Sequence, residues 1–156
     1  MSTPQQTPAQ KLQSERLSYP GLLPREIIVF RNWLKLHESE YDRFEYNVRL
    51  GDGFDPGPTF DPKIRQLSQD NTKTRVDAVG FVGSQATLIE VKDRAGFSAI
   101  GQLVGYEALW IQAHPTDMPP KMLLVCNRFA PDILPVLTRN EIELAVVAAD
   151  FSELRG

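Results

Sequence analysis

Apolar residues along the chain follow two kinds of spacing. Apolar positions that recur every three or four residues predict amphipathic helices, whereas short alternating or continuous apolar runs predict strands. Pro24 suits the first position of a helix, and Ser98 can cap the start of another. The predicted elements are helices over 24–39, 99–113 and 130–138, and strands over 44–50, 75–82, 85–92, 122–126 and 142–148.

The order of these elements, α-β-β-β-α-β-α-β, predicts an α/β fold. The second and third strands are close enough in the sequence to form a hairpin, and the strand-helix-strand unit from 86 to 126 predicts a parallel pair. A mixed sheet of this kind buries both faces under helices. We therefore expect a three-layer α/β/α core with a mixed central sheet.

Two segments are predicted to lack regular structure. Residues 1–19 are rich in Ser, Thr, Gln and Pro, which predicts a polar arm that is disordered alone or bound to a partner. The rest of the chain, 20–156, is predicted to be a single domain. Within it, 51–74 begins with Gly-Asp-Gly-Phe-Asp-Pro-Gly-Pro and predicts a long loop, which is usually functional or partner-bound.

The composition is that of a globular domain, because 42% of the residues are apolar and 24% are charged. The single cysteine, Cys126, lies in an apolar run, so we expect a buried thiol rather than a disulfide or a nucleophile. No apolar run is long enough to span a membrane, and no secretory signal is recognisable. We expect a cytoplasmic protein, or a virion protein if the chain is phage-encoded.

The charge balance limits how the chain could bind nucleic acid. A net charge of −3 argues against a tight, nonspecific DNA-binding protein with a broad basic surface. Basic residues nevertheless flank the second and third strands, at Lys73, Arg75 and Arg94. We predict that these residues contact nucleic acid, either alone or with the help of a partner protein.

The predicted hairpin places two acidic residues opposite each other. If Gly83 and Ser84 form a two-residue turn, Asp77 pairs with Glu90 across the strands, with Cβ atoms roughly 5 Å apart. Lys92 follows Glu90 by two residues and therefore projects from the same face. Two carboxylates and an ammonium group thus converge between otherwise apolar strands.

Two interpretations of this cluster are open. In one, Lys92 forms a structural ion pair with a carboxylate, but the second carboxylate is then left without a partner. In the other, Asp77 and Glu90 hold a metal ion such as Mg²⁺, for which carboxylate oxygens are preferred ligands. The same register would place Arg75 opposite Lys92, which is unfavourable for both cations.

The helix that follows the hairpin adds two polar residues on one face. Gln102 and Tyr106 are four residues apart, and this helix must pack back over the strand that carries Glu90 and Lys92. The simplest interpretation is the polar flank of an amphipathic helix. The alternative is that both side chains reach the carboxylate cluster.

Together these residues resemble the PD-(D/E)xK nuclease superfamily. The resemblance comprises Asp77, then Glu90-Val91-Lys92, then Gln102-x-x-x-Tyr106, within the same element order, and it covers about residues 24–127. The Gln-x-x-x-Tyr element resembles the branch with RecB-type and lambda-exonuclease-type nucleases. Val76 replaces the proline that precedes the first aspartate in the literal motif. The resemblance implies a restriction-endonuclease-like core.

The resemblance also implies chemistry. Asp77, Glu90 and the Val91 carbonyl would ligate Mg²⁺ or Mn²⁺, and Lys92 would orient water or neutralise developing charge. Gln102 and Tyr106 would position the DNA strand or the lysine. The superfamily often adds a glutamate from the first helix, for which Glu26 is the candidate, with Glu38 and Glu40 as rivals.

Two hypotheses of function follow from these observations. The first is a metal-dependent nuclease that hydrolyses DNA phosphodiester bonds, possibly within a larger phage or mobile-element assembly. The second is a structural or DNA-packaging component of a virion that keeps the nuclease fold with little or no catalysis. In both, the arm over 1–19 would mediate a homo-oligomer or a larger protein assembly.

Overall fold

The computed structural model describes residues 5–155 as ten helices and strands, with three short 3₁₀ turns between and after them. The helices are α1 (Pro8–Ser18), α2 (Pro24–His37), α3 (Pro62–Thr72), α4 (Phe97–Ala113) and α5 (Leu134–Arg139). The strands are β1 (Arg43–Leu50), β2 (Thr74–Val82), β3 (Gln85–Ala95), β4 (Lys121–Phe129) and β5 (Ile142–Val146). The predicted order is present, with α1 and α3 added to it.

One five-stranded sheet organises the chain, in the order β1-β2-β3-β4-β5. The first three strands form an antiparallel meander, and β3, β4 and β5 are parallel. The sheet is therefore mixed, as predicted, and β3 is the strand at which its direction of pairing changes. The unit β3-α4-β4 is the predicted parallel pair.

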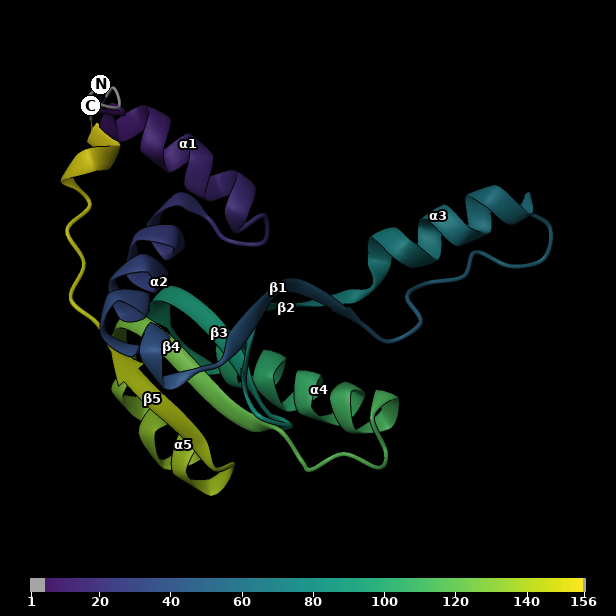
Figure 1. The fold of residues 1–156 in the computed structure, drawn as a ribbon. Coiled ribbons are helices and arrows are strands. Elements are labelled where there is room, and N and C mark those ends of the chain that lie inside the picture. Colours follow the sequence, from purple (N-terminus) through teal and green to yellow (C-terminus); the bar gives the residue numbers. More distant parts are fainter. Residues whose placement is uncertain (1–4, 156) are drawn as a thin grey trace.

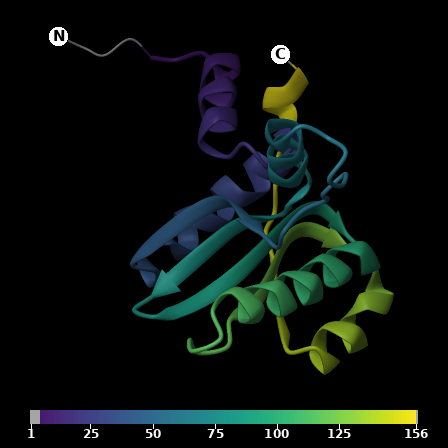
Figure 2. The same cartoon turned by 90° about the vertical axis from the view of Figure 1, so that its right-hand side faces the viewer.

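Helices cover both faces of this sheet, which confirms the predicted three-layer α/β/α architecture. Figures 1 and 2 show α2 on one face and α4 with α5 on the other. Phe30 of α2 is fully buried in one core together with Ile89 of β3. Leu103 of α4 is buried in the second core together with Leu88, the neighbour of Ile89. Strand β3 thus supplies apolar side chains to both cores, which places it at the centre of the molecule.

The segment 51–74 contains a helix that the sequence analysis did not predict. Helix α3 begins after Asp61, whose carboxylate accepts a hydrogen bond from the Lys63 amide (2.8 Å), and Pro62 occupies its first position. Gly53 has a φ of +69°, and a side chain there would collide with the main chain of α3 at Gln69. This tight loop and α3 project together from the end of β1 and β2 (Figure 1). The prediction of a continuous loop was therefore wrong.

Part of the predicted arm is also helical. The Thr7 hydroxyl and the Gln10 side chain form a capping box at the start of α1. Arg31 of α2 bridges α1 and the C-terminal segment, because its guanidinium contacts Glu15 (3.1 Å) and Glu153. The predicted disorder of 1–19 does not match this helix, while residues 1–4 lie outside the described part of the chain. The role of the arm in assembly stays a prediction.

The described helices include none that could span a bilayer, because no helix within residues 5–155 is both long and apolar enough. The cytoplasmic or virion location stays a prediction.

Candidate active site

The turn at Gly83 and Ser84 has the predicted register. Gly83 adopts a φ of +57°, and the strands pair from Val82 with Gln85 to Ala78 with Ile89. Pairing ends there, one position before Asp77 would meet Glu90. The Asp77 carboxylate instead accepts a hydrogen bond from the Val91 amide (3.0 Å). The site therefore forms where β2 separates from β3, in the middle of the sheet.

Strand β1 is also irregular at this point. Asn47 lies between the residues that pair with the two neighbours of Asp77, and it has a φ of +51°. Asparagine tolerates this left-handed conformation better than most residues. Its side chain lines the same pocket as Asp77. The sequence analysis did not identify Asn47, although an asparagine within an otherwise regular strand is a signal of such a conformation.

The pocket at this separation, which we call the carboxylate pocket, has a volume of about 380 Å³. Three acidic residues from three elements line it, together with one lysine: Glu26, Asp77, Glu90 and Lys92. Glu90 is only 1% exposed, and its carboxylate lies 3.1 Å from Lys92 Nζ. Lys92 and Arg75 therefore face three carboxylates in a mostly buried space.

Burial and mutual repulsion perturb the acids of this pocket. Burial, with the charges of Glu90 and Glu26, raises the pKa of Asp77 to about 8, against the opposing effects of the Val91 amide and Lys92. Burial also raises the pKa of Glu90, although Lys92 and Tyr106 oppose this shift. With its pKa at about 8, Asp77 therefore retains its proton near neutral pH when no cation is bound.

Helix α4 brings its two polar residues into the carboxylate pocket, as the sequence pattern suggested. The Tyr106 hydroxyl donates a hydrogen bond to Glu90 (3.0 Å) and accepts one from the Gln102 amide (3.3 Å). Burial raises the pKa of Tyr106, so its hydroxyl stays protonated and acts as a donor. A continuous polar chain thus runs from Gln102 through Tyr106 and Glu90 to Lys92.

We expect Tyr106→Phe to lower the free energy of unfolding by about 1–2 kcal/mol at pH 8. The Glu90 carboxylate would lose a buried donor, so its pKa would rise further and its charged form would be less stable. The deficit should shrink as the pH falls and Glu90 is protonated. Urea unfolding across this pH range measures the effect; an equal deficit at every pH would mean that the hydroxyl contributes packing rather than carboxylate stabilisation.

Glu26 lines the carboxylate pocket, but its carboxylate also has a structural role. It occupies the first turn of α2 and accepts a hydrogen bond from the Leu23 amide (2.8 Å). The predicted rivals Glu38 and Glu40 lie in the turn after α2 and do not line this pocket. Glu26 is therefore the only one of the three glutamates placed near Asp77.

The three predicted nucleic-acid contacts have different positions. Arg75 lines the carboxylate pocket together with Lys92, but the predicted pairing of these two residues across the strands is absent, because β2 and β3 stop pairing at Ala78 and Ile89. Lys73 forms an ion pair with Asp70 of α3 (3.2 Å). Arg94 is exposed on β3, two residues beyond Lys92.

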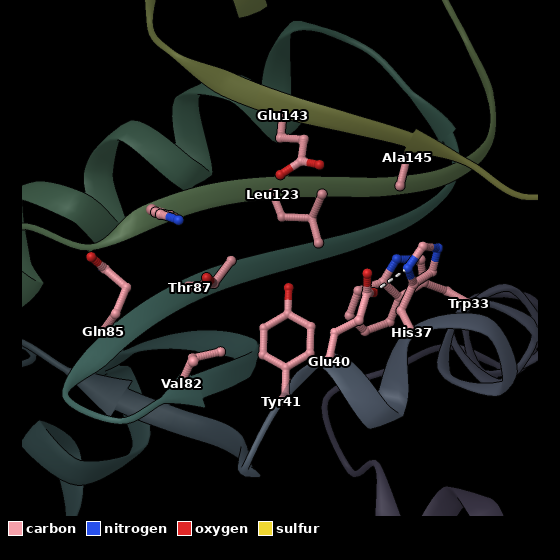
Figure 3. Close-up of a pocket in the computed structure, with 11 residues that line it drawn as sticks. Trp33, His37, Glu40, Tyr41, Val82, Gln85, Thr87, Leu123, Glu143 and Ala145 are labelled. Carbon is pink, nitrogen blue, oxygen red and sulfur yellow. Dashed lines mark hydrogen bonds and ion pairs between the residues drawn. The ribbon is translucent and has the colours of Figure 1, made fainter.

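A separate pocket of about 540 Å³ lies at the opposite end of the parallel strands (Figure 3). Its walls include the His37–Glu40 ion pair and the side chains of Tyr41 and Glu143. Of the site residues predicted from the sequence, it contains Glu40 alone, a rival of Glu26 as a further metal ligand. Ligands of open α/β sheets bind outside the carboxyl ends of the strands. Glu90 and Lys92 lie toward that end of β3, so the carboxylate pocket is the better candidate.

The donor chemistry of the carboxylate pocket fits a hard divalent cation. Within residues 5–155, no group of three or more His, Cys, Asp or Glu side chains is arranged to hold a metal ion. The pocket instead offers two adjacent carboxylates, Asp77 and Glu90, beside the main chain of Val91. Carboxylate and carbonyl oxygens completed by water suit Mg²⁺ or Mn²⁺. A bound cation would also offset the burial that raises both pKa values and the repulsion that raises the pKa of Asp77.

Comparison with known proteins gives little further information. No protein-family model matches the chain, and no curated protein matches it. Among solved structures, the chain is similar to one described as the EndoMS–dsDNA2 complex, with 12% identity and a TM-score of 0.45. The match covers 96% of this chain and 48% of that one, so the chain spans about half its length.

Proposed function

We propose that this protein is a metal-dependent nuclease of the PD-(D/E)xK type that hydrolyses DNA phosphodiester bonds. The observation that carries the proposal is the convergence of Asp77, Glu90 and Lys92 with Gln102 and Tyr106 in one pocket. These residues come from two strands and a helix, and the sequence pattern alone predicts that all five belong to one site. A purely structural ion pair would need neither the second carboxylate nor the tyrosine.

Each residue has a role that follows from its contacts. Asp77 and Glu90, with the Val91 carbonyl, would hold Mg²⁺ or Mn²⁺, and Glu26 is a weaker candidate for a further ligand. When bound, such an ion lowers the pKa of a nearby water and stabilises negative charge on a phosphate. Lys92 keeps its charge because the surrounding carboxylates raise its pKa, although burial acts in the opposite direction.

Lys92 is suited to electrostatic stabilisation of the reaction. Its side chain is 26% exposed, so the ammonium can reach a phosphate at the mouth of the pocket while it contacts Glu90. Tyr106 and Gln102 hold Glu90 in place and are positioning residues in this scheme. Arg75, at the rim, would contact the nucleic acid.

The proposal is tested by incubating the protein with linear single-stranded and double-stranded DNA, in Mg²⁺ and in EDTA. We expect cleavage in Mg²⁺ or Mn²⁺ and none in EDTA, and we expect calorimetry to detect Mg²⁺ binding to the protein alone. Absence of both cleavage and metal binding would overturn the proposal and would favour a structural or DNA-packaging component. A role within a phage or mobile-element assembly stays a prediction.

A further inference from the structure

A second polar pocket lies beside the carboxylate pocket and has no part in the site described above. It has a volume of about 360 Å³, and its walls include Arg25, Arg128 and Arg155 together with Asn127 and Ser152. We call it the arginine pocket. Its residues come from the first turn of α2, the end of β4 and the C-terminal segment, which runs from β5 along α2 toward α1 (Figure 1).

The arginines on one wall of this pocket share a single acid. Nitrogen atoms of Arg25 and Arg128 lie 3.1 and 3.5 Å from the same Asp93 oxygen. Asp93 also accepts a hydrogen bond from the Asn127 amide (3.2 Å). A guanidinium has five N–H donors, and these two side chains are 53% and 61% exposed. Asp93 therefore leaves most of their donors free to bind an anion.

The third arginine, Arg155, lines the pocket from the C-terminal segment. The Asp150 carboxylate accepts a hydrogen bond from the Ser152 amide (2.9 Å), and this bond, with a smaller effect of the Arg155 charge, lowers the pKa of Asp150. Arg25 also lies over the ring of Phe151, 4.7 Å from its centre, which fixes the segment beside α2. Three arginines thus line the pocket, and only two acids, Asp93 and Asp150, lie near them. The pocket is locally positive although the whole chain has a net charge of −3.

The arginine pocket is joined to the carboxylate pocket through two pairs of consecutive residues. Arg25 precedes Glu26 on α2, and Asp93 follows Lys92 on β3. Successive residues of a strand point to opposite faces of a sheet, so the two pockets lie on either side of the same stretch of β3. The main chain of Arg94 pairs with that of Arg128, which adds a fourth arginine at this edge.

We propose that the arginine pocket binds a backbone phosphate of the same nucleic acid that places a phosphodiester bond in the carboxylate pocket. The identity of the ligand as nucleic acid rests on the proposed function. The geometry supports a phosphate because guanidinium groups bind phosphate oxygens through paired N–H donors. An excess of positive charge confined to one pocket also attracts a polyanion to an otherwise acidic protein.

Binding of a fluorescein-labelled DNA duplex, measured by anisotropy in EDTA over a range of salt concentrations, tests this proposal without requiring cleavage. The double variant Arg128→Gln/Arg155→Gln should bind about tenfold more weakly, and its log–log salt slope should be shallower by about one. Arg25 is left intact because it packs on Phe151. The matched control, Arg16→Gln/Arg139→Gln, changes the net charge equally at two exposed positions outside the pocket.

The outcomes separate this inference from the proposed function. A specific loss of affinity in the arginine-pocket variant supports the inference even if the wild-type protein cleaves no DNA. The inference is overturned if the two double variants bind DNA with equal affinity, or if the wild-type protein binds no DNA. In either case, Mg²⁺-dependent cleavage would still support the nuclease proposal. Arg128→Lys/Arg155→Lys should retain most of the salt slope, because it preserves the charges.

Discussion

Replacing Asp77 by asparagine is expected to lower Mg²⁺-dependent DNA cleavage by about 10²- to 10³-fold, or roughly 3–4 kcal/mol of transition-state stabilisation. Asparagine can still accept the hydrogen bond from the Val91 amide, so the strands should keep their arrangement. What is lost is one of the two negatively charged ligands proposed for the metal ion. Cleavage rates over a range of Mg²⁺ concentrations measure the loss, and calorimetry should show weaker Mg²⁺ binding.

The same substitution is expected to stabilise the metal-free protein by up to about 5 kcal/mol at pH 8. An aspartate in the unfolded chain titrates near pH 4, at about its ordinary pKa, whereas the pKa of Asp77 is raised to about 8 in the fold. Between these values the folded state retains a proton that the unfolded state has released. The stability that Asp77 contributes is therefore full below about pH 4 and is lost as the pH rises to about 8. An asparagine avoids this loss.

Urea unfolding of wild type and Asp77→Asn in EDTA, from pH 4 to pH 8, measures this difference. The gain should be near zero at the acidic end and should grow with pH. Asp117→Asn is the matched control, because Asp117 is exposed in the loop after α4 and lines none of the pockets described here. If Asp77→Asn is less stable than wild type at pH 8, the Asp77 carboxylate stabilises the fold. It would then not be a functional group that lowers the stability of the protein.

The parts of the site that the sequence could predict are those set by local geometry. A two-residue turn at Gly83 and Ser84 fixes which residues of β2 and β3 lie opposite each other, and the predicted pairs are present as far as Ala78. The spacing of Gln102 and Tyr106 places both on one helical face regardless of tertiary structure. Because α4 connects two parallel strands, it must pack back over β3. The order of the elements therefore predicts that Gln102 and Tyr106 lie near Glu90, as the hydrogen bond from Tyr106 shows.

The parts that could not be predicted depend on contacts between distant segments. The arginine pocket joins Arg25 to Arg128 and Arg155, which are more than a hundred residues away along the chain, and no periodicity links them. The loss of pairing at Asp77 depends on its side chain taking the Val91 amide, which competes with the regular ladder.

Helix α3 was missed for a different reason, since its signal is local. The Asp61-Pro62 pair is a standard start of a helix, but the turn-forming residues before it dominated the interpretation of the segment. Helix α1 has a similar signal in Thr7 and Gln10, within a composition that is typical of disorder. In both segments, the amino-acid composition favoured irregular structure, whereas the capping residues correctly indicated the start of a helix.

Replacing Lys92 by methionine should affect stability in the opposite direction from Asp77→Asn. Within residues 5–155, Lys92 is the only basic side chain within ion-pair distance of Glu90, which is 1% exposed. Without it, the buried carboxylate has only the Tyr106 hydroxyl, so we expect a loss of about 2–3 kcal/mol at pH 8 that fades as Glu90 is protonated. Cleavage should fall by about 10²-fold or more if, as proposed, Lys92 stabilises developing charge on the phosphate.

The double variant Asp77→Asn/Lys92→Met provides the sharper test of how these charges interact. Removing one acid and its neighbouring cation together leaves Glu90 without the repulsion of Asp77 as well as without Lys92. The two stability changes should therefore largely cancel at pH 8, while cleavage stays as low as in Asp77→Asn. Lys121→Met, at the start of β4 on the opposite end of the parallel strands, is the control for loss of a lysine. If the acids and the lysine serve catalysis, the double variant should be more stable than Lys92→Met but should cleave DNA no faster. An increase in both stability and cleavage would contradict the assigned roles.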